Sequence, residues 1–312
     1  MRKTFVLILT ILSVLLTRAQ ITDYSIFKGK LNFIVCNDLG RNGYYDQKPI
    51  AELMGQMSQK GVNPKFVAAL GDVHHFNGVA SVDDPLWMTN FEQIYSHPEL
   101  MLDWFPVLGN HEYRGNTTAC MEYSHKSRRW MMPARYYTKV FENHGMTLRL
   151  VWIDTTPIIS KYRNAYLKYP DASLQDCNRQ MQWLDSVLTV EREDWVIVMG
   201  HHPIYAETGK SKSERLDMQS HVNTILKRHN VDMYLCGHIH NFQHIRHQDS
   251  NIDYIINSSA SLSRPYVKAV KGTVFCSGEP GFSIVSASKD ALVLRMIDKH
   301  GKVLHEVTRR HK

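Results

Sequence analysis

The sequence is poor in features that would place it in several common protein classes. Only five of its 312 residues are cysteine, an odd number that excludes a framework in which every thiol is paired. No repeat, low-complexity tract or linker rich in proline, glycine and serine divides the chain. The Gly-X-Ser-X-Gly motif of serine hydrolases is also absent. We therefore expect a single domain over residues 20–312 without a serine nucleophile.

Long hydrophobic runs are missing except at the N-terminus. There, Met1–Lys3 precede an apolar run over 4–17 and the short segment Arg18–Gln20, the order of a secretory signal. We predict a signal peptide over 1–19 with cleavage after Ala19, and a secreted or periplasmic protein. The alternative is an uncleaved anchor, but about 14 apolar residues fall short of the roughly 20 that cross a bilayer.

A strong excess of one charge is also lacking. The 37 lysines and arginines exceed the 30 aspartates and glutamates by seven, and signal cleavage would remove three basic residues. The 17 histidines would add positive charge below about pH 6.5. This balance favours an anionic substrate such as a small phosphate ester, and it does not by itself indicate nucleic acid.

The cysteines differ in their sequence surroundings. Cys36 and Cys236 end apolar runs and are expected to be buried thiols. Cys120 and Cys177 lie among polar residues and could form a disulfide, whereas Cys276 has no evident partner.

Apolar runs alternate with helical patterns over the first 250 residues, which predicts an α/β sheet. The expected strands are Leu31–Cys36, Lys65–Leu70, Trp104–Leu108, Leu148–Ile153, Trp195–Met199 and Val231–Cys236, and the expected helices are Pro49–Gln59, Leu86–Tyr95, Asn178–Val190 and Arg215–His229.

The pattern changes after residue 250 to short strands without helices, for which antiparallel pairing is expected. These strands are Ile252–Ile256, Gly272–Phe275, Phe282–Ser286, Ala291–Ile297 and Val303–Val307. The segment Arg114–Arg135 is predicted to be an irregular loop over the face where the strands end, close to the substrate.

Five polar motifs each end an apolar run. Polar side chains at the carboxyl ends of neighbouring strands converge on one face of an open α/β sheet. Their carboxylate, amide and imidazole groups suit two neighbouring metal ions. The motifs are Asn37–Gly40, Gly71–His75, Gly109–Glu112, Gly200–Pro203 and Gly237–His240.

The motifs differ in how specific they are. Gly71-Asp72 alone is more often a turn, whereas Asn110 beside His111 is a stronger indication of function. His238 and His240 are expected on the same side of an extended segment, which suits one ligand for each of two ions.

In this order along one chain, the motifs resemble those of the calcineurin-like metallophosphoesterases. Gly71-Asp72 with a ligand candidate three positions later, Phe76–Val79, Gly109–Glu112 and Tyr234–Asn241 are similar to the low-molecular-weight purple acid phosphatases, the tartrate-resistant type included. The similarity covers about Leu31 to Asn257. It implies a four-layer α/β/β/α sandwich with two mixed β-sheets.

The resemblance also implies a ligand set and an activity. The activity is that of a binuclear-metal phosphatase, which hydrolyses small phosphate monoesters by attack of a metal-activated hydroxide. His111 would contact the phosphate and either donate a proton or stabilise developing charge. The first metal would be held by Asp38, Asp72, His75 and His240, and the second by Asp72, Asn110, His201 and His238.

His75 departs from the family pattern, which has tyrosine at this position. A neutral imidazole supplies no negative charge, so an Fe(III)-tyrosinate is not expected, and the pair would be Fe with Fe, Zn or Mn. Two divalent ions would favour activity nearer neutral pH. His74 is the competing ligand, and the alternative role of His75 is to orient a carboxylate.

The loop after the fourth motif lacks the histidine that relatives often place near the leaving group. Lys210 and His202 are candidates for substrate contact there. The alternatives are a solvated loop charge for Lys210 and a positioning role for His202. A phosphodiesterase or nucleotide-hydrolysing enzyme, and a non-catalytic protein that binds metal or phosphate, remain the alternative functions.

Overall fold

Two stacked β-sheets form the centre of the computed structural model, which describes residues 20–190, 192–269 and 271–311. The expected signal peptide over 1–19 lies outside the described residues. The six-stranded sheet has the order β13 (Val303–Arg310), β12 (Ala291–Asp298), β11 (Gly281–Ala287), β1 (Leu31–Cys36), β2 (Phe66–Ala69) and β3 (Asp103–Pro106). The seven-stranded sheet has the order β10 (Thr273–Ser277), β8 (Phe242–Arg246), β9 (Asp253–Ile256), β7 (Met233–Cys236), β6 (Trp195–Met199), β5 (Met146–Trp152) and β4 (Tyr137–Asn143).

Both sheets are mixed, as predicted. In the six-stranded sheet β1, β2 and β3 are parallel, while β11 pairs antiparallel with β1 and with β12. The strands after residue 250 were expected to pair antiparallel, and β9 does so only on one side, because it is antiparallel to β8 but parallel to β7. The reason is that β8 turns back on the outer side of β9, and not between β9 and β7.

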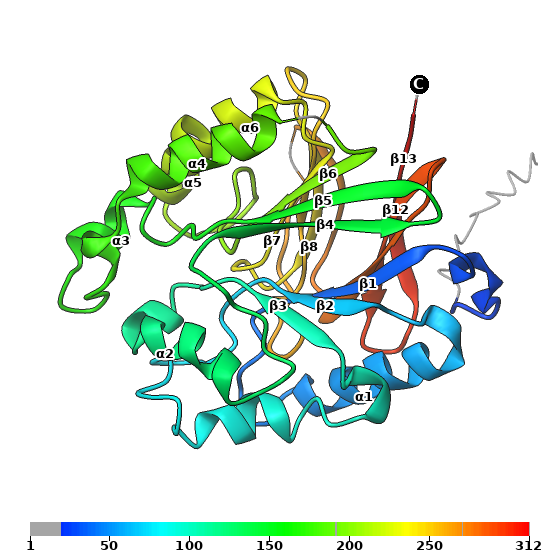
Figure 1. The fold of residues 1–312 in the computed structure, drawn as a ribbon, viewed down its shortest axis with the longest axis horizontal. Helices are drawn as coiled ribbons and strands as arrows, with labels where there is room; N and C mark the ends of the chain where they lie inside the picture. Colours follow the sequence, from blue (N-terminus) through cyan, green and yellow to red (C-terminus); the bar gives the residue numbers. More distant parts are fainter. Residues whose placement is uncertain (1–19, 191, 270, 312) are drawn as a thin grey trace, which may run out of the picture.

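Helices cover the outer face of each sheet, which completes the four layers in Figure 1. α1 (Gln47–Met57) lies beneath the six-stranded sheet, while α4 (Cys177–Thr189), α5 (Lys212–Met218) and α6 (Thr224–Arg228) lie over the other. The helix expected over Leu86–Tyr95 is a π-turn, η3 (Met88–Glu92), and a second π-turn, η8 (Gln219–Asn223), joins α5 to α6. The remaining helical segments are η1 (Tyr24–Phe27), η2 (Ser58–Val62), η4 (Pro98–Leu100), η5 (Glu112–Arg114), α2 (Thr117–Glu122), η6 (Tyr123–His125), α3 (Ser160–Asn164) and η7 (Ala172–Leu174).

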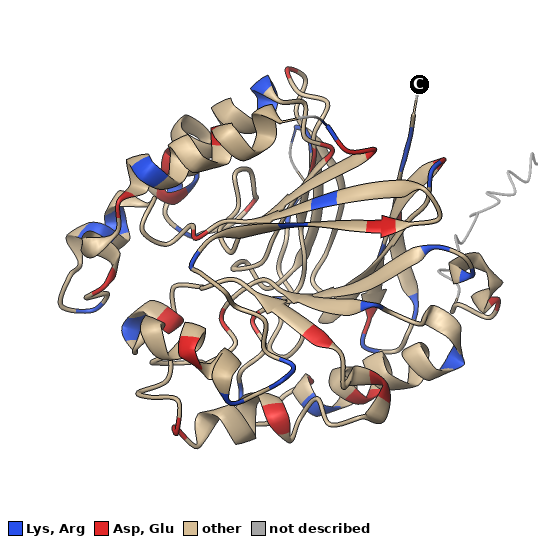
Figure 2. Ribbon diagram, in the orientation of Figure 1, with Lys and Arg blue, Asp and Glu red and all other residues tan. Residues whose placement is uncertain are grey.

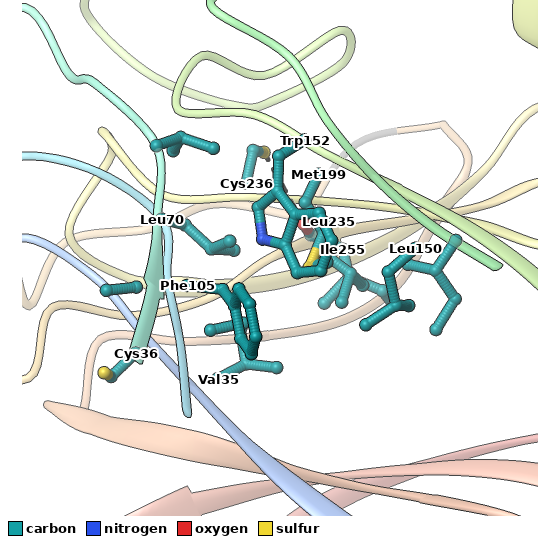
Figure 3. Packing of buried hydrophobic residues seen from close by; sticks show 14 of the residues in the cluster. Val35, Cys36, Leu70, Phe105, Leu150, Trp152, Met199, Leu235, Cys236 and Ile255 are labelled. Carbon is teal, nitrogen blue, oxygen red and sulfur yellow. Dashed lines mark hydrogen bonds between the residues drawn. The ribbon is translucent and has the colours of Figure 1, made fainter. Parts of the chain in front are cut away.

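The main core fills the space between the sheets. Figure 3 shows Val35 and Phe105 of the six-stranded sheet facing Trp152 and Leu235 of the other, and the Phe105 and Trp152 ring centres lie 5.3 Å apart. Every residue of β1 and of β6 is buried. Strands covered on both faces are nearly continuous apolar runs, which is why the sequence located them.

The segment 114–135 is more ordered than predicted. It contains α2 and η6, and its apolar side chains turn inward. Tyr123 stacks on Trp87 with ring centres 3.6 Å apart, and Trp130 meets Trp87 edge-on at 5.1 Å. The prediction of an irregular loop was therefore wrong, because the aromatic side chains fix the segment against the core.

The cysteines of the described residues are all free thiols. Cys120 and Cys177, which we considered as a disulfide pair, each contact a backbone carbonyl instead, those of Asn116 and Pro157. Figure 2 shows acidic and basic residues interspersed over the outer helices and loops. Over the described part of the chain, every helix is too short or too polar to cross a membrane.

Candidate metal centre

The five motifs meet where the strands of both sheets end. Asp38 follows β1, Asp72 follows β2 and Asn110 follows the segment after β3, while His201 and His238 follow β6 and β7. The Asp38 amide donates to the Gly71 carbonyl at 3.0 Å. The predicted convergence is thus present, and it joins the edges of two sheets.

Four of the expected ligands have left-handed backbone conformations. Their φ angles are 52° at Asp38, 54° at Asp72, 70° at His238 and 64° at His240. The segment 237–240 is therefore not extended as predicted. Such conformations cost roughly 1 kcal/mol or more for residues other than glycine, and they concentrate at functional sites. Here they direct the side chains of His238 and His240 into two different groups.

The first group contains Asp38, His75 and His240, whose candidate ligand atoms all lie within 4.8 Å of one another. Nδ1 of His240 lies 2.6 Å from the Leu262 carbonyl oxygen, which can only accept, so this nitrogen carries the proton. Nε2 of His240 then faces Oδ1 of Asp38 at 3.0 Å, and it is the ring nitrogen that remains for a cation. Oδ2 of Asp38 accepts from the His238 amide at 2.9 Å.

The second group contains Asp72, His201 and His238. His201 donates from Nδ1 to the Leu70 carbonyl at 2.8 Å, so Nε2 faces Oδ2 of Asp72 at 3.1 Å. Nε2 of His238 lies 3.1 Å from Glu214, which directs Nδ1 toward Nε2 of His201 at 3.2 Å. Two ring nitrogens that converge in this way suit a shared cation.

Unpaired buried polar atoms also indicate that the donor set fits two metal ions. Both ring nitrogens of His75 and Oδ1 of Asn110 are buried without a hydrogen-bond partner among the described residues. Buried polar atoms are nearly always paired, so unpaired ones call for an explanation. His75 lies against Asp72, with Nε2 3.6 Å from Oδ2, which places its nitrogen where a ligand of the first ion belongs.

Charge reinforces this arrangement. Burial opposes ionisation of Asp38, but the charges of His240 and His201 outweigh it and hold the pKa of Asp38 well below its usual range. Burial also opposes a charged His201, yet the neighbouring Asp72 carboxylate raises the pKa of His201 to about 9. Burial lowers the pKa of His75. The carboxylates are thus ionised and His75 is neutral near pH 7, whereas His201 carries a proton that a bound metal ion would displace.

His111 lies at the open side of the centre. Nδ1 is 2.6 Å from the Phe76 carbonyl oxygen, so it carries the proton and Nε2 faces Asp72, 3.9 Å from Oδ2. The His111 amide donates to Oδ1 of Asp72 at 2.8 Å. Burial lowers the pKa of His111. Its position allows contact with a group bound at Asp72.

His75 and His74 point in different directions. The His74 ring meets Trp87 edge-on with centres 4.4 Å apart, away from Asp72. Of the two candidates, only His75 therefore faces the centre.

His202 and Lys210 also lie close to the second group. His202 is completely buried, with Nδ1 2.8 Å from the Thr155 hydroxyl and Nε2 3.2 Å from that of Tyr162. Both ring nitrogens are thus engaged, which favours a positioning role over substrate contact. Lys210 is not a solvated loop charge, because its Nζ donates to the His238 carbonyl at 2.5 Å and lies 3.1 Å from Nε2 of His238.

Three supporting residues were not assigned from the sequence. Glu112 accepts from the backbone amides of Asp72, His74 and Gly109. Its position directly after His111 could have indicated this role. Glu214 of α5 contacts His238. It lies outside the five motifs, so no sequence pattern indicated this role.

Asn37, the first residue of the first motif, donates to Oδ2 of Asp38 at 2.6 Å and accepts from Asn257 at 2.7 Å. A side chain at Gly237 would lie 2.5 Å from Asn37, which explains the glycine there.

Comparison with known proteins identifies the class. A family model described as calcineurin-like phosphoesterase matches residues 31–242. The chain belongs to the calcineurin-like phosphoesterases, as the motifs predicted.

Within this class the chain is similar to the purple acid phosphatases. Purple acid phosphatase 3 of Arabidopsis thaliana is 30% identical over 301 residues, which cover 91% of this chain and 79% of that protein. Tartrate-resistant acid phosphatase type 5 of Homo sapiens is 28% identical over 256 residues, 77% of each chain.

A solved structure described as GAP50, the anchor in the inner membrane complex of Plasmodium, has a TM-score of 0.77 and 22% identity. The match covers 91% of this chain and 90% of that one, and it supports the fold.

Proposed function

We propose that the chain is an exported phosphatase that hydrolyses small phosphate monoesters at a centre of two metal ions. The observation that carries the proposal is the convergence of unpaired, buried ligand atoms around Asp72 with His111 on the open side. Bound metal ions would supply an activated water and neutralise the phosphoryl group. The names of the curated relatives agree with this activity.

The residues of this chain have separate roles in the proposal. Asp38, His75 and His240 would hold the first ion, Asn110, His201 and His238 would hold the second, and Asp72 would contribute to both. Glu214 holds His238 in the tautomer that frees Nδ1. His111 contacts the phosphate through Nε2, because Nδ1 is engaged by Phe76.

Lys210 adds a positive charge on the side of the second ion. Its Nζ lies beside His238 in the loop where relatives often carry a histidine. We infer that it stabilises negative charge on the bound phosphate or on the departing oxygen. Burial lowers the pKa of Lys210, and the Asp38 and Asp72 carboxylates act in the opposite direction.

The metal pair follows from His75. A tyrosine phenolate at this position would favour Fe(III), whereas a neutral imidazole accepts Fe(II), Zn or Mn. We propose a centre of Fe with Fe, Zn or Mn, no tyrosinate absorption, and a pH optimum nearer neutrality than pH 5. Elemental analysis and a visible spectrum of the purified protein test this. A tyrosinate-like band would refute the assignment.

The activity is tested by comparing a phosphate monoester with the matching bis-ester on metal-loaded protein. Preference for the monoester is expected, because His111 and Lys210 suit a dianionic phosphate. Preference for the bis-ester would instead support a phosphodiesterase on the same scaffold. The name of the Plasmodium neighbour describes an anchor, so a non-catalytic role is the third outcome. Metal binding without turnover of either ester would support it.

Export is tested separately. Expression of the whole chain with its first 19 residues should give a mature N-terminus at Gln20 outside the cytoplasm. Retention of Met1 in the exported protein would contradict cleavage.

A further inference from the structure

Two arginines outside the expected ligand set lie at the open side of the centre. Arg41 directly follows the first motif, and Arg114 lies two residues beyond the third. The Arg41 side chain belongs to a residue that is only 8% exposed, and its Nε and Nη1 are buried without a hydrogen-bond partner among the described residues. Nε of Arg114 is buried and unpartnered in the same way.

Buried guanidinium nitrogens without a hydrogen-bond partner are unusual in a folded protein. A buried donor that has lost its water and gained no acceptor destabilises the fold, and charged donors do so more strongly. The other buried arginine nearby in sequence, Arg129, pairs with Glu92 and with two backbone carbonyls. Arg41 therefore holds Nε and Nη1, and Arg114 holds Nε, for an acceptor that the described residues do not supply. Nη2 of Arg114 donates to the Tyr169 hydroxyl at 3.4 Å.

Both arginines contact Phe76. Cζ of Arg41 lies 4.7 Å from the centre of the Phe76 ring, while Nη1 of Arg114 donates to the Phe76 carbonyl at 3.2 Å. The same carbonyl holds His111 through Nδ1, and the Phe76 and His111 ring centres lie 6.1 Å apart. Phe76 is 64% exposed, so both guanidinium groups contact a surface residue that lies beside His111.

The charges of the two arginines reach the centre. Burial lowers the pKa of Arg41, and the Asp38 and Asp72 carboxylates act in the opposite direction. Burial of His111 lowers its pKa, and the Asp72 carboxylate opposes this shift. The positive charge of Arg114 lowers the pKa of His111 further. Arg41 thus lies within electrostatic range of the ligands, and Arg114 within range of the group expected to contact the phosphate.

We propose that Arg41 and Arg114 form a subsite for a second anionic group, carried by the leaving part of the substrate. This rests on the proposed phosphatase function and adds the class of ester preferred. The planar guanidinium fork matches a carboxylate or a second phosphoryl group. His111 turns Nε2 toward Asp72 and Nδ1 toward the Phe76 carbonyl that Arg114 also binds, so Arg114 lies on the far side of His111 from Asp72. We therefore place the second anion beyond the ester oxygen, and not on the phosphate that is cleaved.

Three esters with the same two-carbon skeleton test the subsite. Ethyl phosphate has no second anion, phosphoglycolate carries a carboxylate, and ethylene glycol bisphosphate carries a second phosphate. We expect the metal-loaded protein to prefer one or both doubly anionic esters over ethyl phosphate. A preference for both indicates any anion, and a preference for the bisphosphate alone indicates a phosphoryl subsite.

The matched variants are Arg41→Gln and Arg114→Gln, with Arg128→Gln at an exposed position as the control. Each subsite variant should lower the preference by about tenfold or more, mainly through KM for the doubly anionic ester. Arg41→Lys keeps the positive charge but lacks the planar guanidinium fork. Its preference for doubly anionic esters should therefore lie between those of the wild type and Arg41→Gln. Melting temperatures identify a variant that is simply unfolded. If Arg41→Gln does not fold, the change in ester preference of Arg114→Gln decides whether the subsite exists.

The proposal is overturned if no ester is preferred, or if the variants slow all three esters equally. Calorimetric measurement of the equilibrium binding of phosphoglycolate and ethyl phosphate distinguishes failure of the subsite proposal from failure of the proposed function. If neither ester is hydrolysed, the phosphatase assignment fails. Tighter binding of phosphoglycolate that disappears in Arg41→Gln would still support the subsite, and equal binding of both esters would refute it.

Discussion

Glu112 gives the sharpest test of how the centre is held together. This buried carboxylate accepts from the amides of Asp72 at 2.9 Å and Gly109 at 2.7 Å through Oε2, and from His74 at 2.9 Å through Oε1. It thereby ties the second motif to the third. Each buried N–H left without an acceptor costs about 1–3 kcal/mol.

Replacement by alanine and by glutamine should have different effects. Glu112→Ala leaves three amides unpaired, so the free energy of unfolding should fall by about 3–9 kcal/mol. A water that enters the cavity would bring the loss toward the lower end of this range. Glu112→Gln keeps one oxygen for the Asp72 and Gly109 amides but turns an NH₂ group toward the His74 amide, a loss of about 1–3 kcal/mol. Typical domains are stable by only 5–15 kcal/mol, so the alanine variant approaches unfolding.

Urea denaturation of both variants measures these losses, with Glu122→Gln on the exposed surface of α2 as the control. The expected order of stability is wild type, then Glu112→Gln, then Glu112→Ala. Metal content after purification should fall in the same order, because Asp72 loses its fixed position. A loss below about 1 kcal/mol for Glu112→Ala, or a glutamine variant less stable than the alanine one, would refute the reasoning.

Three further predictions concern individual residues. Asn110→Ala removes a ligand of the proposed second ion, so metal content should fall toward one ion per chain and activity by at least about 100-fold; unchanged activity would revive the non-catalytic alternative. His75→Tyr should bind Fe(III) and gain a visible absorption band that the wild type lacks; a colourless iron-loaded variant would remove position 75 from the first site. Burial raises the pKa of Asp154 from 3.8 to about 7. The folded state therefore binds a proton that the unfolded state has lost, and stability should fall by roughly 4 kcal/mol or less as the pH rises from about 4 to 7. Asp154→Asn should flatten this part of the pH–stability curve, and an unchanged slope would contradict the assignment.

Much of the fold was predictable because its central strands are buried on both sides. β1 and β6 begin and end at the residues expected from their apolar runs. β4 and β8 were not predicted, since β4 at the sheet edge has only one buried residue, Tyr137, and β8 carries Gln243 and His244. The pairing of β9 with β7 depends on contacts made only after both sheets form.

The candidate site was predictable to the level of residue type and order. Spacing located Asp38, Asp72 and Asn110, but not the left-handed turns that direct His238 and His240 into separate groups. It also could not locate Glu214 or Arg41, because isolated charged residues in a helix or loop are usually solvated. Their roles follow from tertiary contacts, which no local pattern records.

The position of the centre between two sheets has a consequence for how the protein acquires it. The His238 amide binds Asp38 across 200 positions of sequence, and neither proposed ion has its ligands within one sheet. A chain synthesised only as far as β6 contains Asp38, Asp72 and Asn110 but lacks His201, His238 and His240. Metal binding at the proposed centre would therefore be a late event, available only to chains that extend past His240. Metal uptake during refolding should thus lag behind the formation of secondary structure, and it can serve as a reporter of native assembly.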